Sequence, residues 1–417
     1  MKNRFFLLIP LIFVFAHNVA AQDMLDLDID SLDSLFEESL PEPEQAEEAS
    51  SSTVFGDVKK RGLFFSASYE FIGGIAPGWD QRPWEFDGEE EFSWGPGIKM
   101  LSGITIDARL SEAFRVITTL NYSIPGFDLI LGDFFFDYNF LNRVFLRAGK
   151  YEHSWGISGF TNLLARIPEN AKDGSVYGPS YIIKADIPIG VGGIQLLALT
   201  RSDIAHSKLP TKSDIGYGGK YNLALRWADF DMGIFYQDNM ALRGFLSAKT
   251  TLWNTEFYNE WLVAVNVHSD NAASFAVNLG WGRDFFNGKI SMGGEFFYNG
   301  EGSSYFYKPQ TSLRDAETIP FADLFGLSFN FFYRVSGYGN PRFFVSVNYL
   351  PAQASAQLIP GFRITPLSHI DVYLAVPMVF GSKDGYYYNH SSDLYNRPFS
   401  IMLLVTLSGD IRVGWNF

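Results

Sequence analysis

The chain has 417 residues, of which 47% are hydrophobic and 17% aromatic, and it contains no cysteine. The absence of cysteine excludes a disulfide framework, a thiolate metal site and a cysteine nucleophile. The formal net charge is −14, which makes nucleic acid a poor partner. Beyond the N-terminus, no stretch has the roughly 20 uncharged apolar residues that a membrane-spanning helix needs, so the sequence does not predict a helical membrane bundle.

Residues 1–21 have the pattern of a secretory signal peptide. Lys2 and Arg4 precede an apolar run from Phe5 to Ala16, and small residues follow up to Ala21. Such a peptide has three parts: a basic start, a short apolar core and small residues at the cleavage site. We therefore expect cleavage after Ala21 and export of the rest of the chain.

Residues 22–60 form an acidic segment that we expect to be periplasmic and largely disordered. Its part from Gln22 to Thr53 holds eleven acids and no base. Four apolar residues in its first half have the 4-3-4 spacing of one helical stripe, which leaves a short amphipathic helix open: Leu25, Ile29, Leu32 and Phe36.

The same segment matches a calcium-binding loop weakly. Asp26, Asp28, Asp30 and Glu37 fall at positions 1, 3, 5 and 12 of that loop. Ser31 stands where the loop needs glycine for its sharp turn. We expect no metal site here, and no motif in the chain indicates a cofactor.

Residues 61–417 are dominated by strands in which apolar and polar residues alternate. The C-terminus is the clearest case. Eight apolar residues between Ile401 and Phe417 share odd positions, and the polar residues from Ser400 to Asn416 take even ones. Terminal aromatics such as Trp227 and Trp281 favour a membrane barrel over a soluble sandwich, since barrel strands end in aromatics at the lipid interface.

Eighteen strands are predicted, beginning near residues 63, 98, 115, 129, 143, 180, 193, 217, 230, 244, 257, 273, 289, 325, 342, 357, 369 and 400. Long connections follow the odd-numbered strands and short turns follow the even-numbered ones. This asymmetry is typical of outer-membrane barrels whose two termini are periplasmic. The predicted fold class is all-β: a transmembrane antiparallel up-and-down β-barrel of about 16–18 strands, with the acidic segment as an N-terminal extension.

Two motifs resemble Gram-negative outer-membrane porins and porin-like channels. The first is the terminal strand 412–417, which ends in Phe417 and has Trp415 two residues before it. The second is the stretch 146–156, which is similar to the Gly-Lys/Arg to Trp-Gly strand end of several such channels. Arg412 departs from the pattern, because glycine is common at that position.

The resemblance implies a passive diffusion pore for small hydrophilic solutes, embedded in outer-membrane lipid. It implies that Trp415 and Phe417 form a signal for the barrel-assembly machinery, and it leaves a homotrimer open. It also implies that the connection 152–178, which follows the fifth strand, folds inward and narrows the pore.

Charged residues on the polar faces of the strands are the predicted pore lining. They either set ion selectivity or pair with one another. The candidates are Lys99, Arg109, Arg115, Asp133, Asp137, Arg143, Arg147, Lys184, Asp186, Lys220, Arg226, Arg334, Arg342, Arg363 and Arg412.

Two other functions remain as alternatives. A fatty-acid-type transporter of hydrophobic substrates would need an N-terminal hatch, and residues 22–60 are too acidic and proline-rich for one. A hydrolase active at the barrel rim would need a nucleophile beside a base. His153-Ser154, His268-Ser269 and His390-Ser391 are sequence neighbours whose side chains point to opposite faces of a strand, so we expect no catalytic residues.

Overall fold

The structure is a computed structural model. It describes residues 61–86, 92–94, 96–124, 126, 128–151, 153, 155–157, 164, 180–200, 212, 215–237, 242–265, 273–299, 325–351, 354–381 and 397–416. The expected signal peptide, the acidic segment up to residue 60 with its calcium-loop match, and Phe417 lie outside this part.

The described residues form strands and one short 3-10 helix, η2 (Pro83–Glu85). The first half of the barrel contains β1 (Gly62–Ile75), β2 (Gly78–Trp79), β3 (Phe92–Ser93), β4 (Pro96–Arg109), β5 (Phe114–Ile124), β6 (Asp128–Phe140), β7 (Val144–Tyr151), β8 (Ser180–Ile189), β9 (Gly192–Thr200), β10 (Ile215–Ala224) and β11 (Asp229–Gln237).

The second half contains β12 (Leu242–Leu252), β13 (Thr255–Val265), β14 (Ala273–Phe285), β15 (Ile290–Asn299), β16 (Phe325–Arg334), β17 (Arg342–Leu350), β18 (Ser355–Leu367), β19 (Ile370–Ala375), β20 (Met378–Gly381), β21 (Phe399–Ser400) and β22 (Met402–Asn416). Four short segments extend longer strands, so the barrel has 18 strands.

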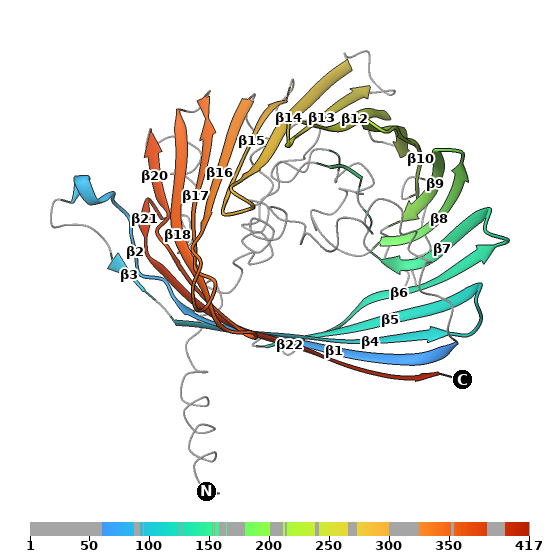
Figure 1. Ribbon diagram of the computed structural model, residues 1–417, viewed down its shortest axis with the longest axis horizontal. Helices are drawn as coiled ribbons and strands as arrows, with labels where there is room; N and C mark the ends of the chain where they lie inside the picture. The colour runs from blue at the N-terminus through green and yellow to red at the C-terminus, as the bar shows by residue number, and fades with distance from the viewer. Residues whose placement is uncertain are drawn as a thin grey trace, which may run out of the picture.

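The first and last strands pair with each other and close the barrel (Figure 1). Their antiparallel register runs from Gly62 opposite Asn416 to Ile75 opposite Leu403. Every other strand pairs with its neighbours in the sequence, which gives an up-and-down topology. The all-β barrel prediction is confirmed, and every predicted strand start lies within two residues of the observed one.

Tight turns connect alternate strand pairs at one end of the barrel, here called the turn end; the opposite end is the loop end. Leu141–Asn142, Trp253–Asn254 and Phe286–Asn287 each have positive φ at both residues. Two such residues in succession characterise the turn whose twist matches that of the flanking strands. Asparagine tolerates this conformation, which explains its place in all three turns.

Large apolar residues are exposed along the turn end. They are Leu110, Leu141, Val191, Trp227, Trp253, Phe286, Tyr338 and Leu367. Amphipathic aromatics favour membrane interfaces. The turn end therefore resembles the interfacial rim of a membrane barrel.

Candidate functional site: the inner face of the barrel

The outer and inner faces of the barrel differ along every clear strand. On β13 the outward residues are apolar and exposed, whereas the inward residues are buried: Phe257, Trp261 and Val263 against Tyr258, Glu260 and Leu262. On β22 the outward residues Leu403, Val405 and Leu407 are likewise exposed, and Met402, Leu404 and Thr406 are buried. An exposed apolar outer face is what lipid requires, so the inner face is the candidate functional site.

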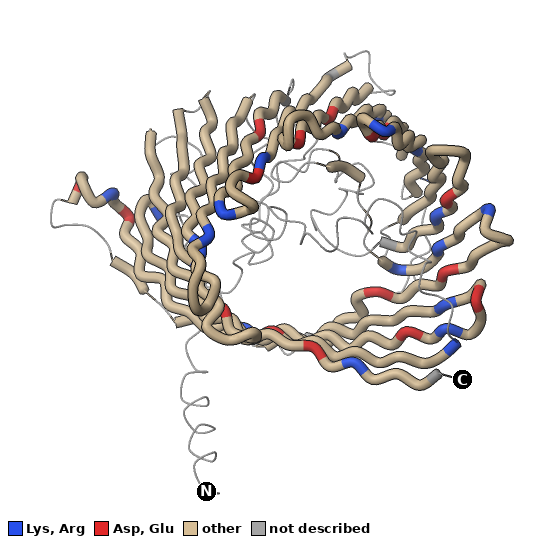
Figure 2. Tube along the Cα trace, viewed as in Figure 1, with Lys and Arg blue, Asp and Glu red and all other residues tan. Residues whose placement is uncertain are grey.

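Many charged residues on the inner face form ion pairs with one another. Figure 2 shows the acidic and basic positions distributed along the strands of the barrel. Asp107 binds both Arg109 and Arg115, with N–O distances of 3.0 Å. Asp137, only 1% exposed, binds Arg147 at 2.7 Å. The Arg147 guanidinium also lies 4.3 Å from the centre of the Phe135 ring. Burying a charged side chain in the wall removes it from water, which costs free energy. Pairing each charge with an opposite one offsets part of that cost.

Further pairs follow the same pattern: Lys184–Asp186, Lys220–Asp231, Arg363–Asp371 and Arg412–Asp410. Lys99 and Asp133 also lie on inward positions of their strands, and both interact with other groups. Arg412 is on the inner face at the turn end, and its side chain is 81% exposed.

Two of the predicted lining residues lie outside the strands. Arg143 is exposed in the turn that follows Phe140, and Arg226 is exposed in the turn that follows Ala224. The structure differs from the sequence expectation because alternation shows which way a residue points but not where hydrogen bonding to the neighbouring strand ends.

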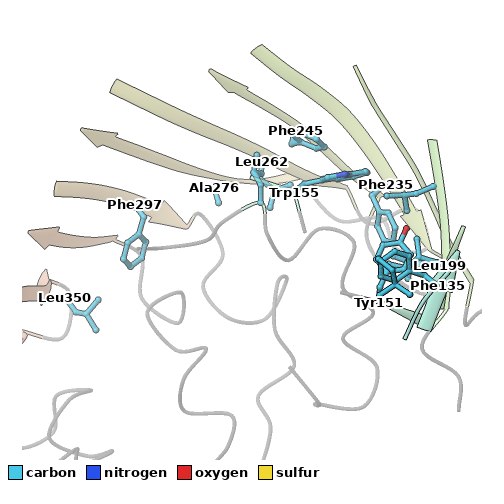
Figure 3. Packing of buried hydrophobic residues seen from close by; sticks show 14 residues of the cluster. Phe135, Tyr151, Trp155, Leu199, Phe235, Phe245, Leu262, Ala276, Phe297 and Leu350 are labelled. Atoms are coloured by element: carbon cyan, nitrogen blue, oxygen red, sulfur yellow. The ribbon is translucent and has the colours of Figure 1, made fainter. Parts of the chain in front are cut away.

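After the loop end of β7, residues 153 and 155–157 lie inside the barrel. Trp155 is 2% exposed and packs on the inner face against Phe235 of β11 and Phe245 of β12, with ring centres 6.4 and 5.2 Å away. Figure 3 shows Trp155 lying along the strands that carry these residues. The Ile157 N–H donates to Glu260 of β13 at 2.6 Å. We call residues 153 and 155–157 the inward segment; apart from Leu164, the rest of the connection 152–178, which is predicted to narrow the pore, lies outside the described residues.

Gln195 of β9 anchors the inward segment. Its Oε1 accepts hydrogen bonds from His153 Nε2 at 3.1 Å and Trp155 Nε1 at 2.7 Å. Its Nε2 donates to Asp186, which pairs with Lys184. Burial, reinforced by the charge of Lys184, lowers the pKa of His153 to about 4. His153 is therefore neutral near pH 7 and donates through Nε2.

Buried polar residues continue around the wall beside the inward segment. Glu260 is 0% exposed and Glu295 is 3% exposed. The Tyr258 hydroxyl and the Asn278 amide both donate to the Glu295 carboxylate. The anchoring roles of Gln195 and Glu260 are not predicted from the sequence, because they depend on contacts between segments 40 and 103 residues apart.

An apolar layer accompanies these polar contacts on the inner face. It extends from Ile117 on β5 to Leu350 on β17 and includes Trp155 and Leu164 from the connection after β7 (Figure 3). Such a layer is buried in the structure rather than exposed to a wide water-filled lumen. The connection after β7 therefore contributes side chains to packing inside the barrel.

Within the described residues, no helix is long and apolar enough to cross a membrane.

The described part of the chain also contains no group of three or more acidic or histidine side chains placed to hold a metal ion.

A closed antiparallel barrel with an apolar outer face and a charged, partly filled inner face has the architecture of a transmembrane β-barrel. Three solved structures from Pseudomonas aeruginosa are similar: OccK3, OccK11 and the outer-membrane protein OpdK, with TM-scores of 0.54, 0.52 and 0.51 and sequence identities of 10%, 8% and 9%. They cover 84%, 86% and 84% of this chain, and the match covers 96%, 99% and 99% of theirs.

The match covers nearly the whole of each neighbour, so the likeness extends over the whole barrel. At this identity the likeness concerns the fold alone. No protein-family model matches the chain, and no curated protein matches it in sequence.

Proposed function

We propose that this protein is an outer-membrane porin through which small hydrophilic solutes diffuse passively. The observation that carries the proposal is the inward segment packed on the charged inner face of a closed barrel. A segment in that position narrows a lumen without blocking the outer, lipid-facing surface. The fold of the neighbouring structures supports the same function and an outer-membrane location.

The charged wall supports the passage of polar rather than apolar solutes. Bases and acids alternate on β4 to β11 and hold each other in place. A surface of this kind offers hydrogen bonds and hydration to a solute in transit. The apolar inner residues are buried in packing, so they support a filled wall rather than a path for a hydrophobic substrate.

A catalytic role receives no support from the described residues. His153 hydrogen-bonds the amide of Gln195, which cannot act as a nucleophile or orient a base as a carboxylate does. The proposal is therefore a channel without an enzymatic step. The proposal also includes export through a cleaved signal peptide. In addition, it assigns to Trp415 and Phe417 a role in recognition by the assembly machinery.

Single-channel recording in a planar bilayer tests the proposal. The purified full chain should insert and give discrete conductance steps that rise linearly with voltage at small potentials. Removing residues 159–173 should increase the step size and admit larger sugars, because part of the constricting connection is lost. A folded barrel that never conducts ions would contradict the proposal.

Gln195→Leu is a sharper variant, because it removes the acceptor of His153 and Trp155 while keeping the size of the side chain. We expect the inward segment to detach more often and the open current to become noisier and larger. Asn330→Leu is the matched control, since Asn330 is a buried inward amide on β16, away from the inward segment. Equal currents in both variants would show that Gln195 does not position the constriction.

A further inference from the structure

Three arginines on neighbouring strands lie directly opposite one another on the inner face. The register places Arg334 of β16 opposite Arg342 of β17, and Arg342 opposite Arg363 of β18. We call these residues the arginine row. Like charges directly opposite in an antiparallel pair destabilise the sheet. The arrangement therefore needs a negative charge from elsewhere.

The carboxylate nearest to the arginine row is already used by one end of it. Asp371 of β19 binds Arg363 through both carboxylate oxygens, at 3.3 and 3.0 Å, and also accepts a hydrogen bond from Thr365. In the part of the chain that the structure describes, neither Arg334 nor Arg342 has a carboxylate at ion-pair distance. Three guanidiniums facing one carboxylate leave two positive charges.

The surroundings of the row strengthen its attraction for an anion. The Nε of Arg334 is buried and has no hydrogen-bond partner among the described residues. Phe344, 3% exposed, lies two positions after Arg342 on the inner face. Tyr373, 5% exposed, lies directly opposite Arg363, whose guanidinium is 5.0 Å from the Tyr373 ring centre. Apolar neighbours lower the local dielectric, so charge interactions there are stronger than in water.

The turn between β14 and β15 contacts the row through the backbone. The backbone N–H of Arg334 donates to the carbonyl of Lys289 at 2.7 Å. On β5, β7 and β8, bases have acidic neighbours at 2.7–3.1 Å. The like-charged register of β16–β18 differs from that arrangement.

We propose that the arginine row binds a phosphoryl dianion, either free inorganic phosphate or the phosphate group of a small solute. Arginine forks match the geometry of phosphate oxygens, and adjacent forks reach different oxygens of one tetrahedral group. Two negative charges balance the two positive charges that Asp371 leaves. The proposal deepens the proposed function, and only its consequence for transport rests on that function.

Isothermal titration calorimetry on the purified full chain in detergent tests binding without a current. Inorganic phosphate and glucose 6-phosphate should each bind in a saturable way, and glucose should not. The Arg334→Gln/Arg342→Gln double variant should lose affinity by at least about tenfold, equivalent to about 1.4 kcal/mol. Arg342→Lys keeps the charge without the fork and should fall between the two.

Arg412→Gln is the matched control, because it removes an arginine from the inner face that is paired with Asp410. It should bind phosphate as the unaltered protein does, and heat-modifiable migration on a gel shows that each variant is folded. Tighter binding of glucose 6-phosphate than of phosphate would assign the site to a phosphorylated solute. Absent binding, equal affinity in the double variant, or equal binding of glucose would overturn the proposal.

Bilayer recordings separate this proposal from the porin proposal. Adding phosphate to a potassium chloride solution should reduce the current of the unaltered protein and leave that of the double variant unchanged. If the protein binds phosphate but never conducts, the porin proposal fails and the anion site stands. If it conducts with a current that phosphate does not alter and calorimetry shows no binding, the anion site fails alone.

Discussion

The inner face of the barrel has two sectors that use charge differently. On β4–β11, each basic side chain that the structure pairs has an acid beside it, and the inward segment packs along this side. On β16–β18, the bases face each other and share one acid at the edge of the row. The difference separates two kinds of charged wall residue: a base paired with an acid, and a base that the proposed anion site would leave available for a solute.

Among the variants described here, Asp137→Ala should lower the free energy of unfolding most. The substitution leaves Arg147 without its buried partner, and losing one member of a buried pair costs about 3–5 kcal/mol. Urea titration of the barrel in lipid vesicles, followed by tryptophan fluorescence, measures the free energy of unfolding. Asp229→Ala, at the exposed start of β11, is the control and should change little. Equal effects would show that the pairs do not stabilise the wall.

Val405→Arg tests the assignment of faces on which the two sectors depend. Val405 points outward on β22 and is 40% exposed, so the arginine would meet lipid and cost about 2–4 kcal/mol near the membrane midplane. Ser408→Arg, on the inward parity of the same strand and exposed, should cost much less. The same titration measures both, and similar losses would mean that the strand parity is wrong.

The barrel could be predicted from the sequence because its signal is local. Period-two alternation and the turn residues between strands fix strand number and direction, and the parity of β22 appears directly in residues 402–416. Strand ends carry a weaker signal, which explains the placement of Arg143 and Arg226 in turns.

The two sectors could not be predicted in this way. Which base meets which acid depends on the register between strands: Arg147 lies opposite Asp137, whereas Arg342 lies opposite two arginines. A shift of two residues in either register would keep every side chain on its face and change every pair. The anchoring of Trp155 by Gln195 depends likewise on a tertiary contact that no local pattern records.

Acidification should loosen the inward segment before it affects the arginine row. Burial holds the pKa of His153 near 4, below its ordinary value of 6.5. The unfolded chain therefore takes up the proton first, so stability is complete above about pH 6.5 and falls by up to about 3 kcal/mol as the pH drops to about 4. Urea midpoints at pH 7.5, 5.5 and 4.5 measure the fall. His153→Gln should reduce the slope in this range, and an unchanged slope would remove His153 from the explanation.

Arg342→Gln should change the free energy of unfolding least. It should raise this free energy, whereas Asp137→Ala should lower it. In a low-salt chloride buffer without phosphate, removing the central arginine relieves repulsion from Arg334 and Arg363, and cross-strand pairs of this kind are worth about 0.2–1 kcal/mol each. The free energy of unfolding should therefore rise by about 1 kcal/mol. Phosphate should reverse the order, because a ligand that binds only the folded state stabilises the unaltered protein in proportion to the logarithm of its concentration. Urea titrations with and without phosphate measure this crossing. A variant that is less stable than the unaltered protein in both buffers would place Arg342 among the structural pairs of the other sector.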